Sequence, residues 1–137
     1  WQRAAKALST VGLGGLESRG INELSGGQFQ RVMFARMSLQ NAPVLIFDEP
    51  FNAIDQQTVL DLMAVIRRWH EEGRTLLIVV HDLVLVREFF PQALLLAREP
   101  VTWGKTSEVL TEEHLLQSRT MAQAWDRAAA ICRQEPL

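Results

Sequence analysis

Two adjacent glycines, Gly26 and Gly27, stand between Ser25 and Gln28 at the start of an expected helix. The first amides of a helix have no partners within the helix and lie at the positive end of its dipole. Because glycine has no Cβ, a phosphate can approach those amides closely. Each glycine costs a ligand-free helix about 1 kcal/mol, so the pair needs an explanation. A phosphate-binding turn and simple N-capping by Ser25 both fit the pattern.

Two carboxylates, Asp48 and Glu49, follow the apolar run Val44–Phe47 and precede Pro50. A carboxylate at the end of a buried strand can hold Mg²⁺, directly or through water, because hard cations prefer oxygen ligands. The neighbouring carboxylate can orient or deprotonate an attacking water. The alternative is a pair of solvated acids without a function. The apolar run before them and the proline after them disfavour that alternative.

A histidine, His81, follows the second apolar run at 76–80 and can donate a hydrogen bond to a terminal phosphate. Asp55 precedes a predicted helix, where it favours the N-cap position, and any functional role would be additional. His70 and His114 stand in polar helical surroundings and are interpreted as surface residues.

Apolar residues recur with helical spacing in several segments and form short continuous runs in others. The pattern predicts strands at 44–47, 76–80 and 94–97, a turn at Pro100 and Gly104, and helices at 1–11, 25–41, 56–72, 82–89, 107–119 and 121–133. The expected apolar stripes are Phe29, Val32, Met33 and Met37 in the second helix and Val59, Leu62, Met63, Ile66 and Trp69 in the third. Continuous apolar runs are typical of strands covered on both faces.

Strands that alternate with helices predict an α/β fold, a mostly parallel sheet flanked by helices with right-handed crossovers. Ligands of such folds bind outside the carboxyl ends of the strands. Two of the predicted strands finish on groups able to do chemistry, the first on Asp48 and Glu49 and the second on His81. We therefore expect these three side chains to share one rim of the sheet.

The bulk composition excludes several classes of protein. The 137 residues suffice for one domain, and the 47% hydrophobic and 22% charged shares are ordinary for a soluble protein. A net charge of -2 gives no indication of a nucleic-acid partner. The single cysteine, Cys132, excludes an internal disulfide framework and is expected as a small apolar residue on a helix. No apolar run approaches the roughly 20 residues that span a bilayer, and no signal peptide is seen.

A possible phosphate-binding loop at Gly104-Lys105-Thr106 is rejected. The pattern G-x-x-x-x-G-K-[ST] needs glycine at position 99, where the sequence has Glu99. Trp103 is also too bulky for a phosphate cradle. The sequence therefore predicts that a complete nucleotide site is absent from this chain.

In their order and spacing, four motifs resemble the C-terminal half of an ABC-type ATPase subunit. Leu24–Gln28 matches the family's signature motif without a change, and Val44–Asp48 matches its Walker B strand, with Glu49 at the position of the catalytic glutamate. Phe51–Asp55 resembles the D-loop, and His81 the switch histidine. The resemblance covers roughly residues 1 to 110.

This resemblance implies a partial P-loop NTPase-like domain that lacks the Walker A part. Residues 1–42 would form the helical signature subdomain, 43–106 the sheet core and 107–137 C-terminal helices. The Walker A loop, the adenine-stacking aromatic and the Q-loop precede the signature in this family and are missing here. Because the chain also opens at Trp1, we expect it to be the back part of something longer and inactive alone.

The family works as a head-to-tail dimer with ATP and Mg²⁺ as cofactors. Transferred to this sequence, the resemblance implies γ-phosphate contacts in trans by Ser25, Gly26, Gly27 and Gln28, Mg²⁺ binding by Asp48, polarisation of water by Glu49, γ-phosphate binding by His81 and coupling between the two sites by Asp55. Catalysis would be mostly positioning and electrostatics.

The leading hypothesis for function is the energy-coupling ATPase subunit of a membrane transporter. Its partners would be a second ATPase subunit and integral membrane permease subunits, with no nucleic acid, and it would be cytoplasmic and peripheral at the inner membrane face. Val101–Lys105 and Glu108–Thr111 are most similar to bacterial zinc and manganese importers. The transported species, the direction of transport and the role of 121–133 are not predicted.

Two alternatives remain. One is a soluble ABC ATPase of DNA repair or ribosome function, although Asn52-Ala53-Ile54-Asp55 differs from the Asn-His-Leu-Asp usual in the ribosome-associated group and no heptads occur. The other is a non-catalytic interaction fragment from a truncated gene.

Overall fold

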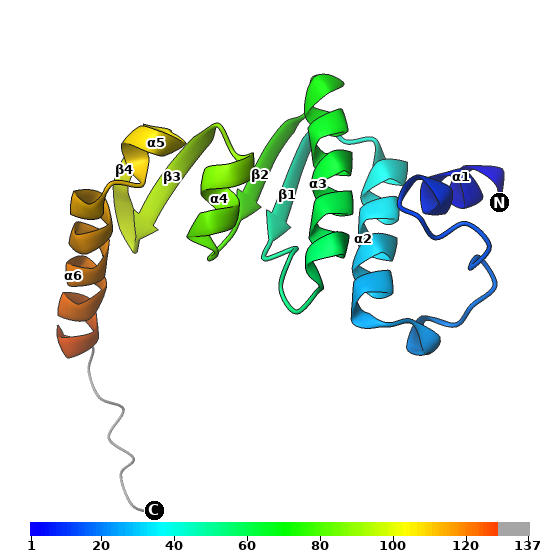
Figure 1. The fold of residues 1–137 in the computed structure, drawn as a ribbon, viewed down its shortest axis with the longest axis horizontal. Coiled ribbons are helices and arrows are strands. Elements are labelled where there is room, and N and C mark those ends of the chain that lie inside the picture. The colour runs from blue at the N-terminus through cyan, green and yellow to red at the C-terminus, as the bar shows by residue number, and fades with distance from the viewer. Residues whose placement is uncertain (129–137) are drawn as a thin grey trace, which may run out of the picture. The chain divides into compact units, whose positions relative to one another are not determined.

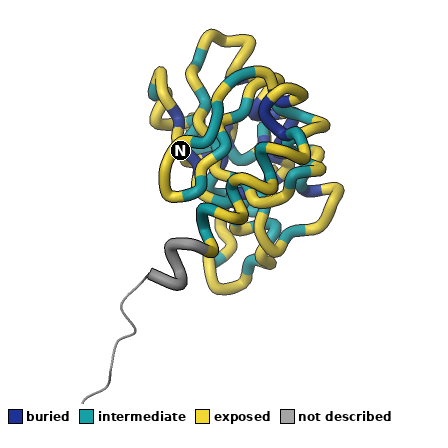
Figure 2. The backbone as a smooth tube through the Cα atoms, turned by 90° about the vertical axis from the view of Figure 1, so that its left-hand side faces the viewer, coloured by how far each residue is buried: buried dark blue, intermediate teal, exposed yellow. Residues whose placement is uncertain are grey.

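The computed structural model describes residues 1–128, and the chain divides into two compact units, with the division between His81 and Asp82. Each unit has its own small sheet and helices (Figure 1). In Figure 2, the buried residues form only short stretches of the backbone tube, and most of the tube is coloured as intermediate or exposed. The finer division predicted at residues 42 and 106 stays a prediction.

The first unit carries the three predicted helices and two predicted strands, plus one short 3₁₀ turn. Its elements are α1 (Gln2–Thr10), η1 (Ile21–Glu23), α2 (Gly26–Gln40), β1 (Val44–Asp48), α3 (Gln56–Glu71) and β2 (Thr75–Val79). β1 and β2 pair in parallel, from Val44 opposite Thr75 to Asp48 opposite Val79. Helix α3 forms the crossover between these strands, and the predicted α/β class is confirmed.

Local chemistry sets the bounds of the two long helices. Asp55 caps α3 by accepting a hydrogen bond from the backbone N–H of Thr58 at 2.9 Å. Gly73 follows the end of α3 with φ +84°, a conformation that glycine adopts without strain. Asn41, the residue after α2, has a left-handed backbone conformation that ends the helix, and Pro43 follows two residues later.

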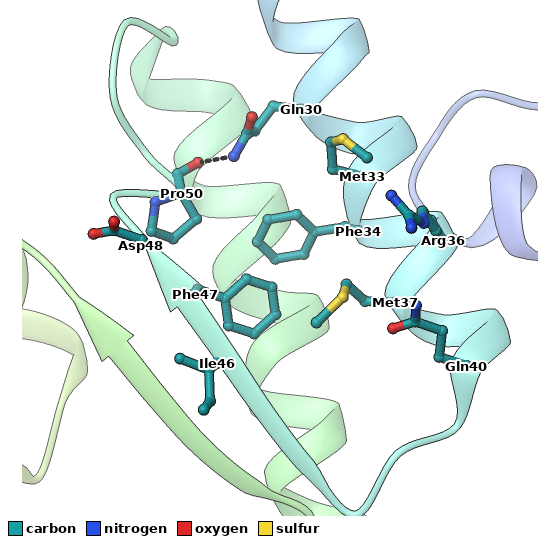
Figure 3. A pocket seen from close by; sticks show the side chains of 10 residues that line it. All are labelled: Gln30, Met33, Phe34, Arg36, Met37, Gln40, Ile46, Phe47, Asp48 and Pro50. Atoms are coloured by element: carbon teal, nitrogen blue, oxygen red, sulfur yellow. Dashed lines mark hydrogen bonds between the residues drawn. The ribbon is translucent and has the colours of Figure 1, made fainter.

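The core of the first unit is a stack of three aromatic rings, Phe34 of α2, Phe47 of β1 and Trp69 of α3. Their centroids lie 5.1 Å apart for Phe34 and Phe47, 5.7 Å for Phe34 and Trp69, and 6.0 Å for Phe47 and Trp69. Leu45 and Leu62 are fully buried beside them. Figure 3 shows Phe34 and Phe47 facing each other between α2 and β1. The stack fixes α2 and α3 against one face of the sheet.

Two expectations about burial in this unit are wrong. β1 is covered on one face only, because α2 and α3 pack on the side of Leu45 and Phe47 while Val44 and Ile46 remain 53% and 63% exposed. The predicted stripe of α2 is also wrong in part. Val32, Met33 and Met37 are half-buried, but Phe29 is exposed, and the buried residues of the helix, Phe34 and Ala35, lie outside the stripe. The apolar residues of α2 are spread over several faces of the helix, so their spacing alone does not identify the face that packs against α3 and β1.

The second unit comprises α4 (Leu83–Phe89), β3 (Gln92–Ala97), β4 (Glu99–Lys105), α5 (Thr106–Val109) and α6 (Glu112–Ala128). β3 and β4 form an antiparallel hairpin that turns at Arg98, which has φ +66°. The predicted turn at Pro100 and Gly104 is therefore wrong. Pro100 is tolerated because the strand register shifts between Leu95 and Leu96, and proline fits such irregularities.

The predicted break between two C-terminal helices is also misplaced. α6 runs through Thr120, and the break lies before it, where Thr111 Oγ1 accepts a hydrogen bond from the His114 backbone N–H. The surface interpretation holds for His70 but is wrong for His114, which is half-buried with Nδ1 3.1 Å from the Val109 carbonyl oxygen. Cys132 and the end of the segment predicted at 121–133 lie outside the described residues.

Within residues 1–128, no helix combines the length and apolar character that crossing a bilayer requires.

Candidate functional site

The ends of β1 and β2 bring Glu49 and His81 into direct contact. The Glu49 backbone N–H donates to the Val79 carbonyl at 3.0 Å, which continues the parallel pairing beyond Asp48. His81 Nε2 then lies 2.7 Å from Glu49 Oε1, and the two side chains form an ion pair when the imidazole is protonated. The side chains are 78% and 39% exposed, so a ligand can reach both groups. The expected neighbourhood of these two side chains is found.

The loop that follows β1 holds Glu49 in an unusual backbone conformation. Glu49 has φ +47° and Ala53 has φ +57°, both in the left-handed region that costs a residue with a side chain free energy. The Asn52 amide supports the turn, because Nδ2 donates to Glu49 Oε2 at 3.4 Å and the backbone N–H donates to the Glu49 carbonyl at 3.2 Å. Such strain is concentrated at functional sites in proteins.

Asp48 is accessible at the end of β1 and lines a cavity of about 300 Å³ between α2 and the strand (Figure 3). Gln30 of α2 closes one side of this cavity by donating from Nε2 to the Pro50 carbonyl at 2.7 Å. No group of three or more His, Cys, Asp or Glu side chains gathers among residues 1–128 to enclose a metal ion. An exposed single carboxylate nevertheless fits Mg²⁺, which is commonly held by one or two carboxylates together with water and substrate phosphates.

Ser25 and Gln28 cap α2 reciprocally. Ser25 Oγ accepts from the Gln28 backbone N–H at 3.2 Å, and Gln28 Oε1 accepts from the Ser25 backbone N–H at 3.0 Å. The capping role of Ser25 is therefore confirmed, and it does not exclude a second role at a phosphate.

Gly26 and Gly27 occupy the first turn of α2, and the chain's own geometry gives little reason for glycine there. The described glycines with positive φ are Gly12, Gly15, Gly73 and Gly104. A Cβ built on Gly26 would have only the Ala53 carbonyl oxygen near it, at 4.0 Å. A Cβ on Gly27 would lie 3.4 Å from Thr58 Oγ1 and 3.7 Å from Asp55 Oδ2. The exposed Gly26 therefore leaves open space in front of the helix.

Asp55 lies beside this turn with both carboxylate oxygens engaged by one residue. Thr58 donates its backbone N–H to Oδ1 at 2.9 Å and its hydroxyl to Oδ2 at 2.8 Å. Both bonds hold the pKa of the Asp55 carboxyl below its usual value, and the bond from the Thr58 backbone N–H has the larger effect. The expected N-cap role is thus confirmed.

The structure brings the predicted residues together in two groups. Glu49 and His81 form one, with Asp48 next to Glu49 in the chain, and Gly27 and Asp55 form the other. No hydrogen bond or ion pair among the described residues joins Ser25–Gln28 to Glu49 or His81. Sequence reasoning missed Gln30, Arg31 and Thr58, because no local pattern marks a contact between residues 20 or more positions apart.

The way in which stability depends on acid pH tests the hydrogen bonds that Asp61 accepts from Arg31 and Gln57. Hydrogen bonds from the Arg31 guanidinium and then from the Gln57 amide lower the pKa of Asp61 in the folded protein. A lowered folded-state pKa contributes stability above the unfolded value of about 4, and this stability is lost as the pH falls through the folded value. We expect Asp61→Asn to flatten the loss of stability below about pH 4, measured by urea unfolding from pH 7 to 3. Glu71→Gln at an exposed position is the control, and equal slopes for Asp61→Asn and the parent would contradict the assignment.

Comparison with known proteins identifies the family. The sequence pattern described as ABC transporter matches residues 1–52, which include the diglycine turn and the end of β1. The zinc transport system ATP-binding protein TroB of Treponema pallidum is 40% identical over 113 residues, covering 82% of this chain and 42% of the relative. The manganese transport system ATP-binding protein MntB of Bacillus subtilis is 40% identical over 114 residues, covering 83% of this chain and 46% of the relative. The chain belongs to the ABC transporter family of ATP-binding proteins.

Solved structures agree with this membership of the ABC family. A dimeric bacterial ABC transporter cassette, MJ0796, is 32% identical with a TM-score of 0.65, covering 77% of this chain and 46% of that one. An ABC transporter of the metal-chelate type, solved facing inward, is 27% identical with a TM-score of 0.78, covering 87% of this chain and 48% of that one. The chain thus spans about half the length of the ABC proteins it matches.

Proposed function

We propose that this chain supplies part of the Mg²⁺-dependent ATP hydrolysis site of an ABC transporter's energy-coupling subunit. The observation that supports this function best is the 2.7 Å contact between Glu49 and His81 at the carboxyl ends of two parallel strands. Asp48, Glu49 and His81 match the residues that the family uses on Mg²⁺, the attacking water and the γ-phosphate. Bound Mg²⁺ would neutralise phosphate charge, and Asp48 is the residue that would hold it.

The chemistry asked of this chain is positioning and proton handling. Glu49 Oε2 accepts from Asn52 Nδ2 at 3.4 Å and Oε1 lies 2.7 Å from His81 Nε2, so each carboxylate oxygen has a fixed neighbour on the strained turn. A carboxylate fixed in this way can orient an attacking water and accept its proton. His81, exposed on the same rim with Nε2 at Glu49, can donate to a phosphate oxygen from Nδ1 when the imidazole is protonated. Phosphoryl transfer requires this kind of preorganisation more than covalent chemistry.

The diglycine turn would act on a neighbouring subunit. Gly26 is exposed, its φ is not positive, and its missing Cβ leaves space that nothing in the described chain fills. The N-terminal amides of α2 can receive a phosphate through that space. These features support a head-to-tail dimer in which Ser25, Gly26, Gly27 and Gln28 contact ATP held by the other subunit and Asp55 couples the two sites.

The names of the relatives support a cargo and a membrane partner for this protein. TroB and MntB are named as zinc and manganese transport ATP-binding proteins. We extend this to a divalent metal importer, with integral permease subunits as partners and a cytoplasmic position at the inner face of the membrane. Residues 1–42 would then be the helical signature subdomain, 43–106 the catalytic core and 107–137 the C-terminal appendage.

The test of this function is a fused protein, in which the Walker A portion of Bacillus subtilis MntB is joined to this chain at the start of the aligned region. We expect a folded protein that hydrolyses ATP only with Mg²⁺ present. A fused protein that folds and binds ATP without hydrolysing it would overturn the proposal. The 137 residues alone should show no turnover, because Gly104 and Lys105 lie in β4 and not in a phosphate-binding loop. Turnover by the purified chain that Glu49→Gln abolishes would contradict this part.

Replacing Gly26 should separate stability from activity. Gly26→Ala meets no steric obstacle, so the higher helix propensity of alanine should stabilise the chain by up to about 1 kcal/mol. The added methyl group would also keep a phosphate away from the amides, and ATP hydrolysis by the fused protein should fall at least about tenfold. Ser38→Ala, near the other end of α2, is the control and should leave hydrolysis unchanged. Unaltered hydrolysis in Gly26→Ala would argue against the phosphate role.

A further inference from the structure

Arg31 of α2 connects three separate segments of the first unit. Its Nη1 donates to the Val11 carbonyl at the end of α1 at 3.0 Å. Its Nη2 lies 2.6 Å from Asp61 Oδ2 and 3.3 Å from Thr58 Oγ1, both on α3. The Arg31 side chain is 17% exposed and Thr58 is 5% exposed, so the contact between these two is largely shielded from water, whereas the Asp61 side chain is 41% exposed. A guanidinium with its donors fixed in a plane is suited to holding several acceptors at once.

The Thr58 hydroxyl extends this connection to Asp55. A hydroxyl can accept one hydrogen bond while it donates another. Thr58 Oγ1 accepts from Arg31 and donates to Asp55 Oδ2 at 2.8 Å, so each group in the chain has the correct donor or acceptor role. The same hydroxyl is the nearest atom to a Cβ built on Gly27, at 3.4 Å. Thr58 and Asp55 therefore lie beside the diglycine turn, and Arg31 reaches it through the Thr58 hydroxyl.

We propose that Arg31 is a positioning residue that, through the Thr58 hydroxyl, fixes the carboxylate of Asp55 beside Gly27. Its functional meaning rests on the proposed function, in which Gly27 and Asp55 face the other subunit. The diglycine turn and the carboxylate would then form one preorganised surface and would meet the partner together. Preorganisation lowers the entropy cost of forming such an interface.

The charged groups around Asp55 allow an alternative that the test must exclude. Arg31 on α2 and Asp61 on α3 are both charged, and Arg31 could influence Asp55 through space without Thr58. The second alternative is a role in packing alone, since Arg31 connects α2 to the end of α1. The experiment therefore compares Arg31→Lys in two backgrounds, the parent chain and Thr58→Val, which keeps the shape of Thr58 but removes its hydroxyl.

Two NMR measurements on the nucleotide-free chain report on Asp55. One is the carboxyl titration of Asp55, and the other is hydrogen exchange of the Thr58 amide, which donates to Asp55 Oδ1. We expect Arg31→Lys to raise the pKa of Asp55 and to speed Thr58 amide exchange at least about threefold. Thr58→Val should have the same effect, Arg31→Lys should add nothing in that background, and Thr58→Ser should restore parent values. Arg68→Lys, which alters an exposed ion pair between α3 and the following residue Glu72, is the control.

The outcomes separate the alternatives. Equal effects of Arg31→Lys in both backgrounds would overturn the proposal in favour of action through space. Lower unfolding stability with unchanged Asp55 titration and Thr58 exchange would overturn it in favour of packing. If Arg31→Lys does not fold, Thr58→Val decides alone, because it must change the exchange of the Arg31 Nη protons, and unchanged exchange would overturn the proposal. None of these results requires ATP hydrolysis, so failure here is distinguishable from failure of the proposed function in the fused protein.

Discussion

Glu49→Gln is expected to reduce ATP hydrolysis by the fused protein about 10²- to 10⁴-fold, the range for loss of a general base. Glutamine keeps only one of the two side-chain oxygens that face His81 and Asn52, but the backbone hydrogen bond from the Asn52 N–H to the carbonyl of residue 49 is unchanged and should hold the turn after β1. The amide cannot accept a proton from water, however. ATP binding and thermal stability should therefore remain at parent values while hydrolysis is lost. The measurements are steady-state hydrolysis, ATP binding and a thermal melt of the same preparation.

A matched substitution tests whether the position or merely the charge of Glu49 matters. Glu71→Gln removes one exposed carboxylate at the C-terminal end of α3, outside the loop that follows β1, and should leave hydrolysis unchanged. Hydrolysis by Glu49→Gln within about twofold of the parent would exclude Glu49 as the base. Loss of hydrolysis together with loss of folding would instead indicate a structural role for the strained turn.

Trp69→Ala should have the largest effect on stability, a loss of about 3–5 kcal/mol. Trp69 is 1% exposed, and its ring stacks against both Phe34 and Phe47. The Arg74 guanidinium also lies 5.8 Å from the ring centroid, a further interaction that alanine cannot replace. Removal of the indole would leave a cavity at the junction of α2, α3 and β1, the strand that ends at Asp48.

Urea unfolding measures this loss directly. Trp1→Ala is the matched control within the same unit, because Trp1 is 97% exposed and its removal should change stability by less than about 0.5 kcal/mol. A loss below about 1 kcal/mol for Trp69→Ala would show that the aromatic stack is not the core of this unit.

The parts of the site that follow local rules could be predicted from the sequence. Parallel strands joined by a helix end at the same edge of a sheet, which is why the meeting of Glu49 and His81 was predictable. Asp55 and Gly73 mark the ends of α3 by their own chemistry, and the stripe that contains Trp69 has a clear helical period. For these features the sequence pattern and the tertiary structure agree.

The remaining features depend on contacts that no local pattern shows. The hairpin turn at Arg98 lacks the glycine or asparagine that usually announces a left-handed turn residue. The apolar run in β1 indicated coverage on both faces, whereas the helices of its own unit cover one. Arg31 and Asp61 are 30 residues apart, and their pairing depends on how α2 packs against α3. The positioning network was therefore visible only in the structure.

Mixing two inactive variants of the fused protein tests most directly whether the diglycine turn acts on a neighbouring subunit. Gly26→Ala impairs the turn and Glu49→Gln impairs the base, so each variant alone should be nearly inactive. In a head-to-tail dimer of the two, one site combines an intact Glu49 with an intact turn from the other subunit. Mixing should therefore restore up to about a quarter of parent hydrolysis, since half the dimers are mixed and each has one intact site of two. Mixed dimers that form but hydrolyse no more ATP than the separate variants would contradict the trans arrangement.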